Sequence, residues 1–153
     1  MKKISIFLVI VLTIVAAIGF KYMSYKNEYN AIQKENKEFE EYKDKEVYGL
    51  EVGTMINKAV DKNTKNKIEK DNNGNFIQND KNSIEIEIYI TDNETTYKME
   101  TIYNAGTEQF VQYYGNIKFK CSKIEYHENT GRIKYMLFEQ QETSWYCSTK
   151  VEI

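Results

Sequence analysis

Residues 83–90 have the sequence SIEIEIYI, and this stretch decides the fold class. The isoleucines at 84, 86, 88 and 90 alternate with Glu85, Glu87 and Tyr89. An apolar residue at every second position is typical of a β-strand that buries one face and turns the other toward water. The stretch therefore predicts a half-buried strand at one side of a folded core.

A helix is predicted immediately before this strand. After Gly49 the apolar residues recur at offsets 0, 3, 4, 7 and 8, which places them on one helical face. These residues are Val52, Met55, Ile56, Ala59 and Val60. We expect this stripe and the four isoleucines to form the core, the helix to end within 63–67, and Gly49 and Gly53 to allow a close approach to a sheet.

Further elements are predicted downstream. Alternation indicates strands at residues 96–102, 117–126, 133–138 and 145–153, with a short helix at 107–114. A phase shift predicts a bulge near Ser122. The strand at 133–138 is apolar on both faces, which predicts a central position, with Ile133, Tyr135 and Leu137 pointing inward. Residues 46–153 are thus expected to form an α+β domain, one helix across an antiparallel sheet of about five mostly sequential strands.

The N-terminus carries a hydrophobic run, Ile4 to Phe20, after Lys2 and Lys3. A helix of this length reaches about 25 Å, near the lower limit for crossing a bilayer. The lysines are expected to stay in the cytoplasm, so that residues 1–20 anchor the chain and the rest lies outside. The alternative is a cleaved signal sequence, because Ala17 and Gly19 are small residues spaced as a peptidase site requires.

Residues 21–45 lack Pro and Gly and predict a helical stalk that continues from the anchor. Larger side chains recur with heptad spacing at Tyr22, Tyr25, Tyr29, Ile32, Asn36 and Phe39. Such a seam permits self-association, although a solvated stalk explains the pattern as well.

Charge excludes one class of partner. Of 21 basic residues two precede Phe20, which leaves 19 basic and 23 acidic residues beyond it and a net charge of −4. Nucleic-acid binding needs a clustered excess of Lys and Arg, so no nucleic-acid surface is expected.

The predicted layout has a long N-terminal helix that is first hydrophobic and then amphipathic, followed by an antiparallel sheet and a Cys pair near the C-terminus. This layout resembles that of type IV pilins and pseudopilins. The resemblance is one of architecture, since no acidic residue occurs within the hydrophobic run. It implies a subunit that assembles through its N-terminal helix.

Few residues suggest chemistry. His127 is the single histidine, and a Ser-His arrangement with Ser122 or Ser144 lacks the Gly-rich loop that such sites carry. Glu85 and Glu87 lie about 7 Å apart on one strand face, a spacing that paired catalytic carboxylates also show. We expect no catalytic residue.

A turn at 71–75 resembles part of a calcium loop, with oxygen ligands at Asp71, Asn73 and Asn75. Phe76 and Asn82 stand where such loops need Gly and Glu, so neither a metal nor another cofactor is expected.

Cys121 and Cys147 are the only cysteines. Outside the cell they favour a disulfide, which would stabilise the fold by roughly 3.5 kcal/mol in the chain-entropy model. In a regular meander, however, one strand separates them by about 9.6 Å, beyond the roughly 7 Å that a bridge tolerates. A bend of the last segment over the sheet would allow the bridge.

These features favour a membrane-anchored, extracytoplasmic binding or assembly module of the bacterial envelope, without enzymatic activity. Its 13 tyrosines and Trp145 offer rings for stacking on a partner. The alternatives are a secreted hydrolase with scattered site residues and a pilin-like subunit. A cleft lined by perturbed carboxylates would favour the hydrolase, and an exposed aromatic patch would favour the binding module.

Overall fold

A computed structural model describes residues 2–141 of the chain, with side chains from residue 6 onward. These residues form two compact units, 2–37 and 38–141. The first unit consists entirely of helix α1 (Lys2–Glu40). Its apolar side chains between Ile6 and Phe20 are exposed, and within the described residues α1 alone is long and apolar enough to cross a membrane. A helix continuing beyond the hydrophobic run is therefore confirmed.

The helix ends earlier than expected, at Glu40 instead of Lys45. The next residues form a turn in which the Lys43 amide donates to the Glu40 carbonyl at 3.0 Å. Asp44 has a positive φ of 57°, which redirects the chain. The backbone then pairs with another strand, because the Cys121 amide donates to the Lys45 carbonyl at 3.4 Å. Strand pairing thus replaces the last turn of the predicted stalk.

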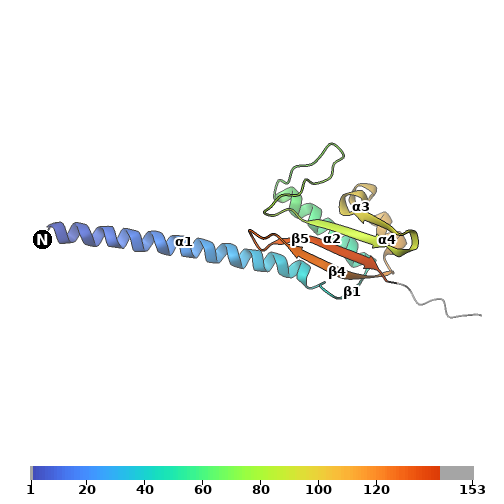
Figure 1. The fold of residues 1–153 in the computed structure, drawn as a ribbon, viewed down its shortest axis with the longest axis horizontal. Helices are drawn as coiled ribbons and strands as arrows, with labels where there is room; N and C mark the ends of the chain where they lie inside the picture. Colours follow the sequence, from blue (N-terminus) through green and yellow to red (C-terminus); the bar gives the residue numbers. More distant parts are fainter. Residues whose placement is uncertain (1, 142–153) are drawn as a thin grey trace, which may run out of the picture. The chain divides into compact units, whose positions relative to one another are not determined.

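The second unit contains a five-stranded sheet in the order β1-β4-β5-β2-β3 (Figure 1). Its strands are β1 (Glu46–Tyr48), β2 (Glu85–Ile90), β3 (Thr95–Lys98), β4 (Lys118–Tyr126) and β5 (Ile133–Gln140). The α+β class and the number of strands are confirmed. One of the five strands, β1, was not predicted, because a strand of only three residues is too short to show an alternating pattern. The strand predicted at 145–153 lies outside the described residues.

The expectation of a wholly antiparallel sheet is wrong for one pair. Strand β5 runs parallel to β2, with Ile86 opposite Met136 and Ile88 opposite Phe138. Strand β5 pairs with β4 on one side and lies in the centre of the sheet, and its other neighbour, β2, precedes it by more than 40 residues in the sequence. The central position of β5 and the bulge at Ser122, where the register shifts between Cys121 and Lys123, are both confirmed.

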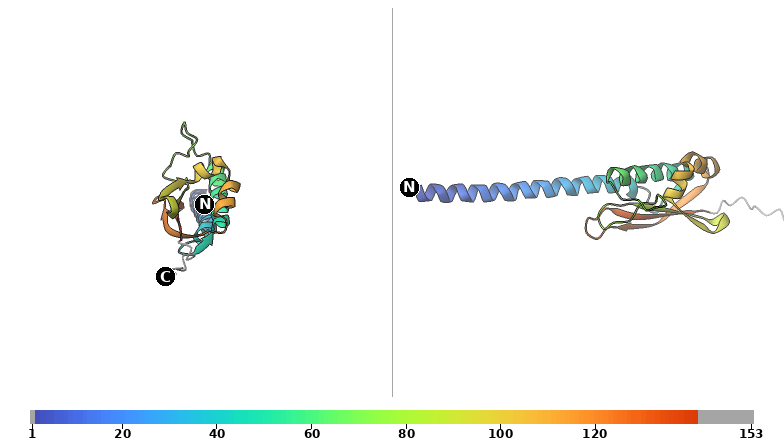
Figure 2. Two further views of the ribbon diagram at one scale, coloured as in Figure 1. Left: turned by 90° about the vertical axis from the view of Figure 1, so that its right-hand side faces the viewer. Right: turned by 90° about the horizontal axis from the view of Figure 1, so that it is seen from above.

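Three helices cover one face of the sheet (Figure 2). They are α2 (Gly49–Lys65), α3 (Met99–Ala105) and α4 (Thr107–Tyr114). Helix α2 and the short helix α4 are as predicted. The strand expected at 96–102 is half wrong, because β3 ends at Lys98 and Met99 begins α3, with Met99 and Ile102 buried. A short apolar run fits a buried helix as well as a strand, so the pattern alone does not distinguish the two. In the structure the run is a helix that buries Met99 and Ile102.

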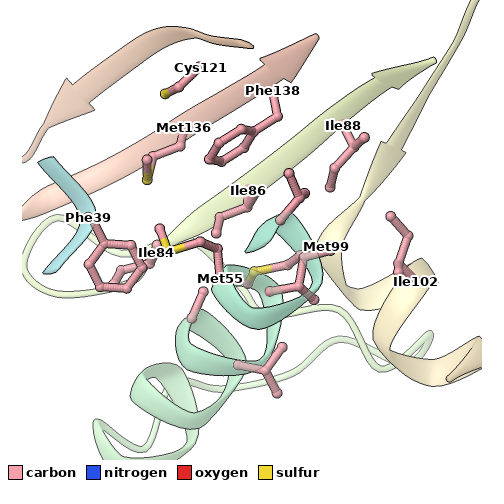
Figure 3. Packing of buried hydrophobic residues seen from close by; sticks show 14 of the residues in the cluster. Phe39, Met55, Ile84, Ile86, Ile88, Met99, Ile102, Cys121, Met136 and Phe138 are labelled. Carbon is pink, nitrogen blue, oxygen red and sulfur yellow. The ribbon is translucent and has the colours of Figure 1, made fainter. Parts of the chain in front are cut away.

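The core lies between α2 and the sheet, and the predicted residues form it (Figure 3). Every stripe residue of α2 and all four isoleucines are buried, with Ile86 and Ile88 at 0% exposure. On β5 the predicted inward set is right for Ile133, which is buried, and wrong for Tyr135 and Leu137, which are half-buried. Met136 and Phe138 lie in the core instead. Both faces of β5 are apolar in sequence, so alternation alone does not determine which one is buried.

The loop between α2 and β2 is held by side-chain amides. Buried Asn63 donates from Nδ2 to the Ile84 carbonyl at 2.7 Å and accepts from the Ile84 amide at 2.8 Å. The Asp71 carboxylate accepts from the Asn73 and Asn75 amides, both at 2.8 Å, and Gly74 has a positive φ of 83°. The predicted turn is therefore present, and its carboxylate caps backbone amides.

Candidate functional site: a tyrosine-lined cavity

A cavity of about 230 Å³ opens between α3, α4 and the end of the β2–β3 hairpin. Its walls are mainly apolar and aromatic. The lining residues are Ile90, Tyr97, Thr101, Ile102, Ala105, Gly106, Gln109, Phe110, Tyr113 and Tyr114. Drug-sized ligands occupy pockets of roughly 300–1,000 Å³, so this cavity is suited to a single side chain or a group of similar size.

The local sequence explains why a hollow forms here. Helix α3 ends at Ala105 and α4 begins at Thr107, so one residue, Gly106, makes the whole connection. Gly106 has a φ of 99°, which a residue with a side chain adopts only under strain. Ala105 and Gly106 together contribute a single methyl group, and the space that larger side chains would fill stays open.

The inner wall of the cavity is rigidly packed. The rings of Phe110 and Tyr114 lie 5.3 Å apart, and the ring of Phe110 lies 6.0 Å from that of Phe119 on β4. Phe110 and Phe119 are buried. Burial is the main cause that raises the pKa of Tyr114, with smaller contributions from Tyr97 and Asp92. Aromatic packing onto the sheet therefore holds this wall in place before any ligand arrives.

The outer rim combines an exposed ring with hydrogen-bonding groups. Tyr113 is 75% exposed, so its ring is an unusually accessible apolar surface. The Tyr97 hydroxyl accepts a hydrogen bond from Asn93 Nδ2 at 2.9 Å, which leaves its proton available for a ligand. Thr101 and Gln109 are also exposed at the cavity. A pocket with apolar walls and a few polar groups at its edge is typical of a binding site.

A second, polar hollow lies at the β4–β5 hairpin. It is lined by Asp80, Glu125, Tyr126, His127, Glu128, Asn129 and Lys134. Its carboxylate Glu125 is paired with Lys123 at 2.6 Å, which is the main cause that lowers the Glu125 pKa. The hollow thus borders an ion pair at the surface of the sheet.

His127 has a structural role. It lies at the β4–β5 hairpin and is buried at 3% exposure. Its Nε2 lies 2.7 Å from the Ser83 carbonyl, which only accepts, so Nε2 carries the proton and donates. Ser122 is exposed on β4, and no hydrogen bond joins it to His127 among residues 2–141. Ser144 lies outside the described residues.

The two predicted carboxylates lie on the outer face of the sheet, where each has a partner. Glu85 binds Lys98 Nζ at 3.1 Å, and Glu87 accepts from the Tyr135 hydroxyl at 2.7 Å. The bond to Glu85 is the main cause that raises the Lys98 pKa. For Tyr135, burial comes first and the bond to Glu87 second, and both raise its pKa. Across neighbouring strands the Lys98 ammonium offsets the charge of Glu85, and the Tyr135 hydroxyl donates a hydrogen bond to Glu87, as is common on a solvated sheet face.

Cys121 is buried on β4, and burial raises the pKa of its thiol to about 11. A thiol with so high a pKa is a poor nucleophile at neutral pH. Cys147 lies outside the described residues, so the disulfide stays a prediction.

No known family model, curated protein or solved structure matches this chain. The resemblance to pilins accordingly stays a prediction as well.

Sequence reasoning missed the cavity. It noted the tyrosines as rings for a partner and placed Tyr113 and Tyr114 in the predicted helix at 107–114, which is α4, but it did not bring Tyr97 next to them. The segment after Lys98 could have revealed the cavity if it had been assigned as a helix. Two short helices would then meet at Ala105 and Gly106, whose small side chains leave a hollow between them.

Proposed function

We propose that this protein is a membrane-anchored module that binds an envelope protein through the tyrosine-lined cavity. The observation that carries the proposal is the combination of fixed aromatic walls with the 75% exposed ring of Tyr113. Interfaces concentrate their binding energy in a few aromatic anchors that fill small pockets. A cavity for one side chain, next to an exposed ring, suits this kind of contact.

We also propose that the second unit lies outside the cytoplasm. The support is the exposed apolar segment of α1 together with Lys2 and Lys3 before it, which orient such a segment with its N-terminus inside. Membrane fractionation with N-terminal sequencing tests this. Retention in the membrane with an intact N-terminus is expected, and recovery from the medium with Phe20 as the first residue would show cleavage.

The binding proposal is tested by cross-linking in intact cells. A photoreactive phenylalanine analogue is introduced at position 113, and in a second strain at position 103. Tyr103 is the matched control, because it is an exposed tyrosine on the neighbouring helix and does not line the cavity. We expect a defined cross-linked protein from position 113 and none, or a different one, from position 103.

A filling variant completes the experiment. Ala105→Trp places a large side chain at an exposed edge of the cavity, where it occupies the hollow without entering the core. The cross-link from position 113 should then disappear while the amount of protein in the membrane is unchanged. Cross-links that persist after the cavity is filled, or that are the same from both positions, would refute the proposal.

A further inference from the structure

Two acidic side chains, Glu108 and Asp92, lie near residues that line the cavity. Glu108 stands in the first turn of α4, and its Oε2 lies 3.6 Å from the point that a Cβ atom on Gly106 would occupy. Asp92 lies in the short helix η1 (Thr91–Asn93), at the end of β2, where its Oδ2 accepts from Gln140 Nε2 at 3.0 Å. Both acids are exposed, and Gly106 and Ile90 beside them line the cavity.

Among residues 2–141, no ion pair balances Asp92 or Glu108. Residues 91–114, which supply nine of the ten lining residues, contain one lysine and four acidic residues. Three of these acids are exposed, and the fourth, Glu100, is buried and accepts from the Phe76 amide at 3.2 Å. That lysine, Lys98, is engaged with Glu85 on the outer face of the sheet at 3.1 Å. None of the lining residues is basic. An apolar cavity at a locally negative surface favours a ligand that combines an apolar group with positive charge.

We propose that the cavity takes an apolar side chain from a partner peptide segment whose neighbouring residues are Lys or Arg. The inference deepens the proposed function and rests on it. The apolar anchor enters between Phe110 and Tyr97, and the flanking cations meet Asp92 and Glu108. A cation beside the exposed ring of Tyr113 gains a further attraction from the ring face. An acidic partner would be repelled at the same positions.

The test uses the full chain in nanodiscs of zwitterionic lipid, with empty nanodiscs as the blank. The probes are three short synthetic peptides with a central Phe, flanked on each side by Lys, by Gln or by Glu, and binding is measured by isothermal titration. We expect the Lys peptide to bind at least about tenfold more tightly than the Glu peptide, which corresponds to about 1.4 kcal/mol. The Gln peptide should fall between them.

Two variants locate the effect. In the double variant Asp92→Asn, Glu108→Gln the preference for the Lys peptide should fall to about twofold or less, while the Gln peptide binds as before. The matched control, Asp80→Asn with Glu128→Gln, removes the same charge at the polar hollow and should keep the preference. Raising the salt from about 0.1 M to about 1 M, which shortens the screening length from about 10 Å to about 3 Å, should also reduce it.

The outcomes separate the two proposals. Equal binding of all three peptides, or a preference that the control variant loses as well, would overturn the charge inference and leave the cavity as a site. Failure of every peptide to bind would overturn the peptide inference itself. In either case the cross-link from position 113 decides the proposed function independently, because it does not depend on the charge of the partner.

Discussion

Three glycines in helices make a graded test of the packing between α2 and α4. A Cβ atom at Gly49 would lie 2.0 Å from the Tyr114 carbonyl oxygen, which is backbone and has no rotamer to change. At Gly53 the nearest atom is a methyl group of Val111 at 2.9 Å, the end of a side chain. At Gly19 in α1 nothing lies within 4 Å. We expected Gly49 and Gly53 to allow a close approach of their helix to a sheet, but the element that approaches them is helix α4.

The same substitution, Gly→Ala, should therefore have three different effects on stability. In each helix Ala gains up to about 1 kcal/mol of intrinsic propensity. At Gly49 the end of α4 must move by about 1 Å to reach a permitted contact, at a cost of about 3 kcal/mol or more for overpacking. The displacement also weakens the bond from the Ile117 amide to the Tyr114 carbonyl, now 2.9 Å, by about 1 kcal/mol. The net expectation is a loss of about 3 kcal/mol.

At Gly53 the gain in helix propensity and the cost of the closer contact are of similar size, because the Val111 side chain can adjust. We therefore expect the free energy of unfolding to change by no more than about 1 kcal/mol. Gly19→Ala should leave the second unit unchanged. Urea unfolding of the full chain in detergent, followed by tyrosine and tryptophan fluorescence, measures all three. For Gly49→Ala the midpoint should fall by about 1–3 M, given slopes of about 1–3 kcal/mol/M. A Gly49→Ala midpoint equal to that of Gly53→Ala would refute the close approach of the two helices.

Three further predictions use the same preparations. Ile86→Ala should cost about 2–5 kcal/mol, because its side chain is fully buried, and an unchanged urea midpoint would contradict the core. The pKa of Tyr126 is raised from 10.0 to about 12 by burial and then by its bond to Glu40, so this tyrosine stabilises the fold below pH 10 and its contribution is lost between pH 10 and about 12. Tyr126→Phe should flatten that part of the pH–stability curve, as seen by unfolding at a series of pH values. Mass spectrometry of the unreduced, alkylated protein should find Cys121 and Cys147 bridged, and two alkylated cysteines would exclude the disulfide.

The fold could be predicted from the sequence where a pattern has one explanation. The isoleucine alternation at 83–90 and the apolar stripe at 52–60 each match a single period, and both elements and their buried faces are as expected. Where a pattern fits two structures equally well, tertiary contacts determine which one forms. Residues 99–102 fit a strand or a helix, and β5 is apolar on both faces. The parallel pairing of β2 with β5 depends on how the helices connect distant strands, which no local pattern records.

The cavity could not be predicted for a related reason. Its lining comes from β2, β3, α3 and α4, so it exists only once the segment after β3 is a helix. No charged residue lines it, and searches for catalytic or metal-binding patterns consequently pass over this region. A count of tyrosines shows that rings are present. It does not show that Tyr97, Tyr113 and Tyr114 meet around one space.

The placement of charges explains why binding is expected at the cavity and not on the open face of the sheet. On that face the ionised groups are largely paired, with Glu46 bound to Lys118 at 3.0 Å and Glu85 to Lys98 at 3.1 Å. A partner that covered these pairs would remove their water without supplying new partners, which costs free energy. At the cavity the exposed apolar surface of Tyr113 gains from burial, and Glu108 has no basic partner among residues 2–141. Under the proposed function, association there would replace water with complementary groups, so the binding energy of this surface should concentrate around the cavity.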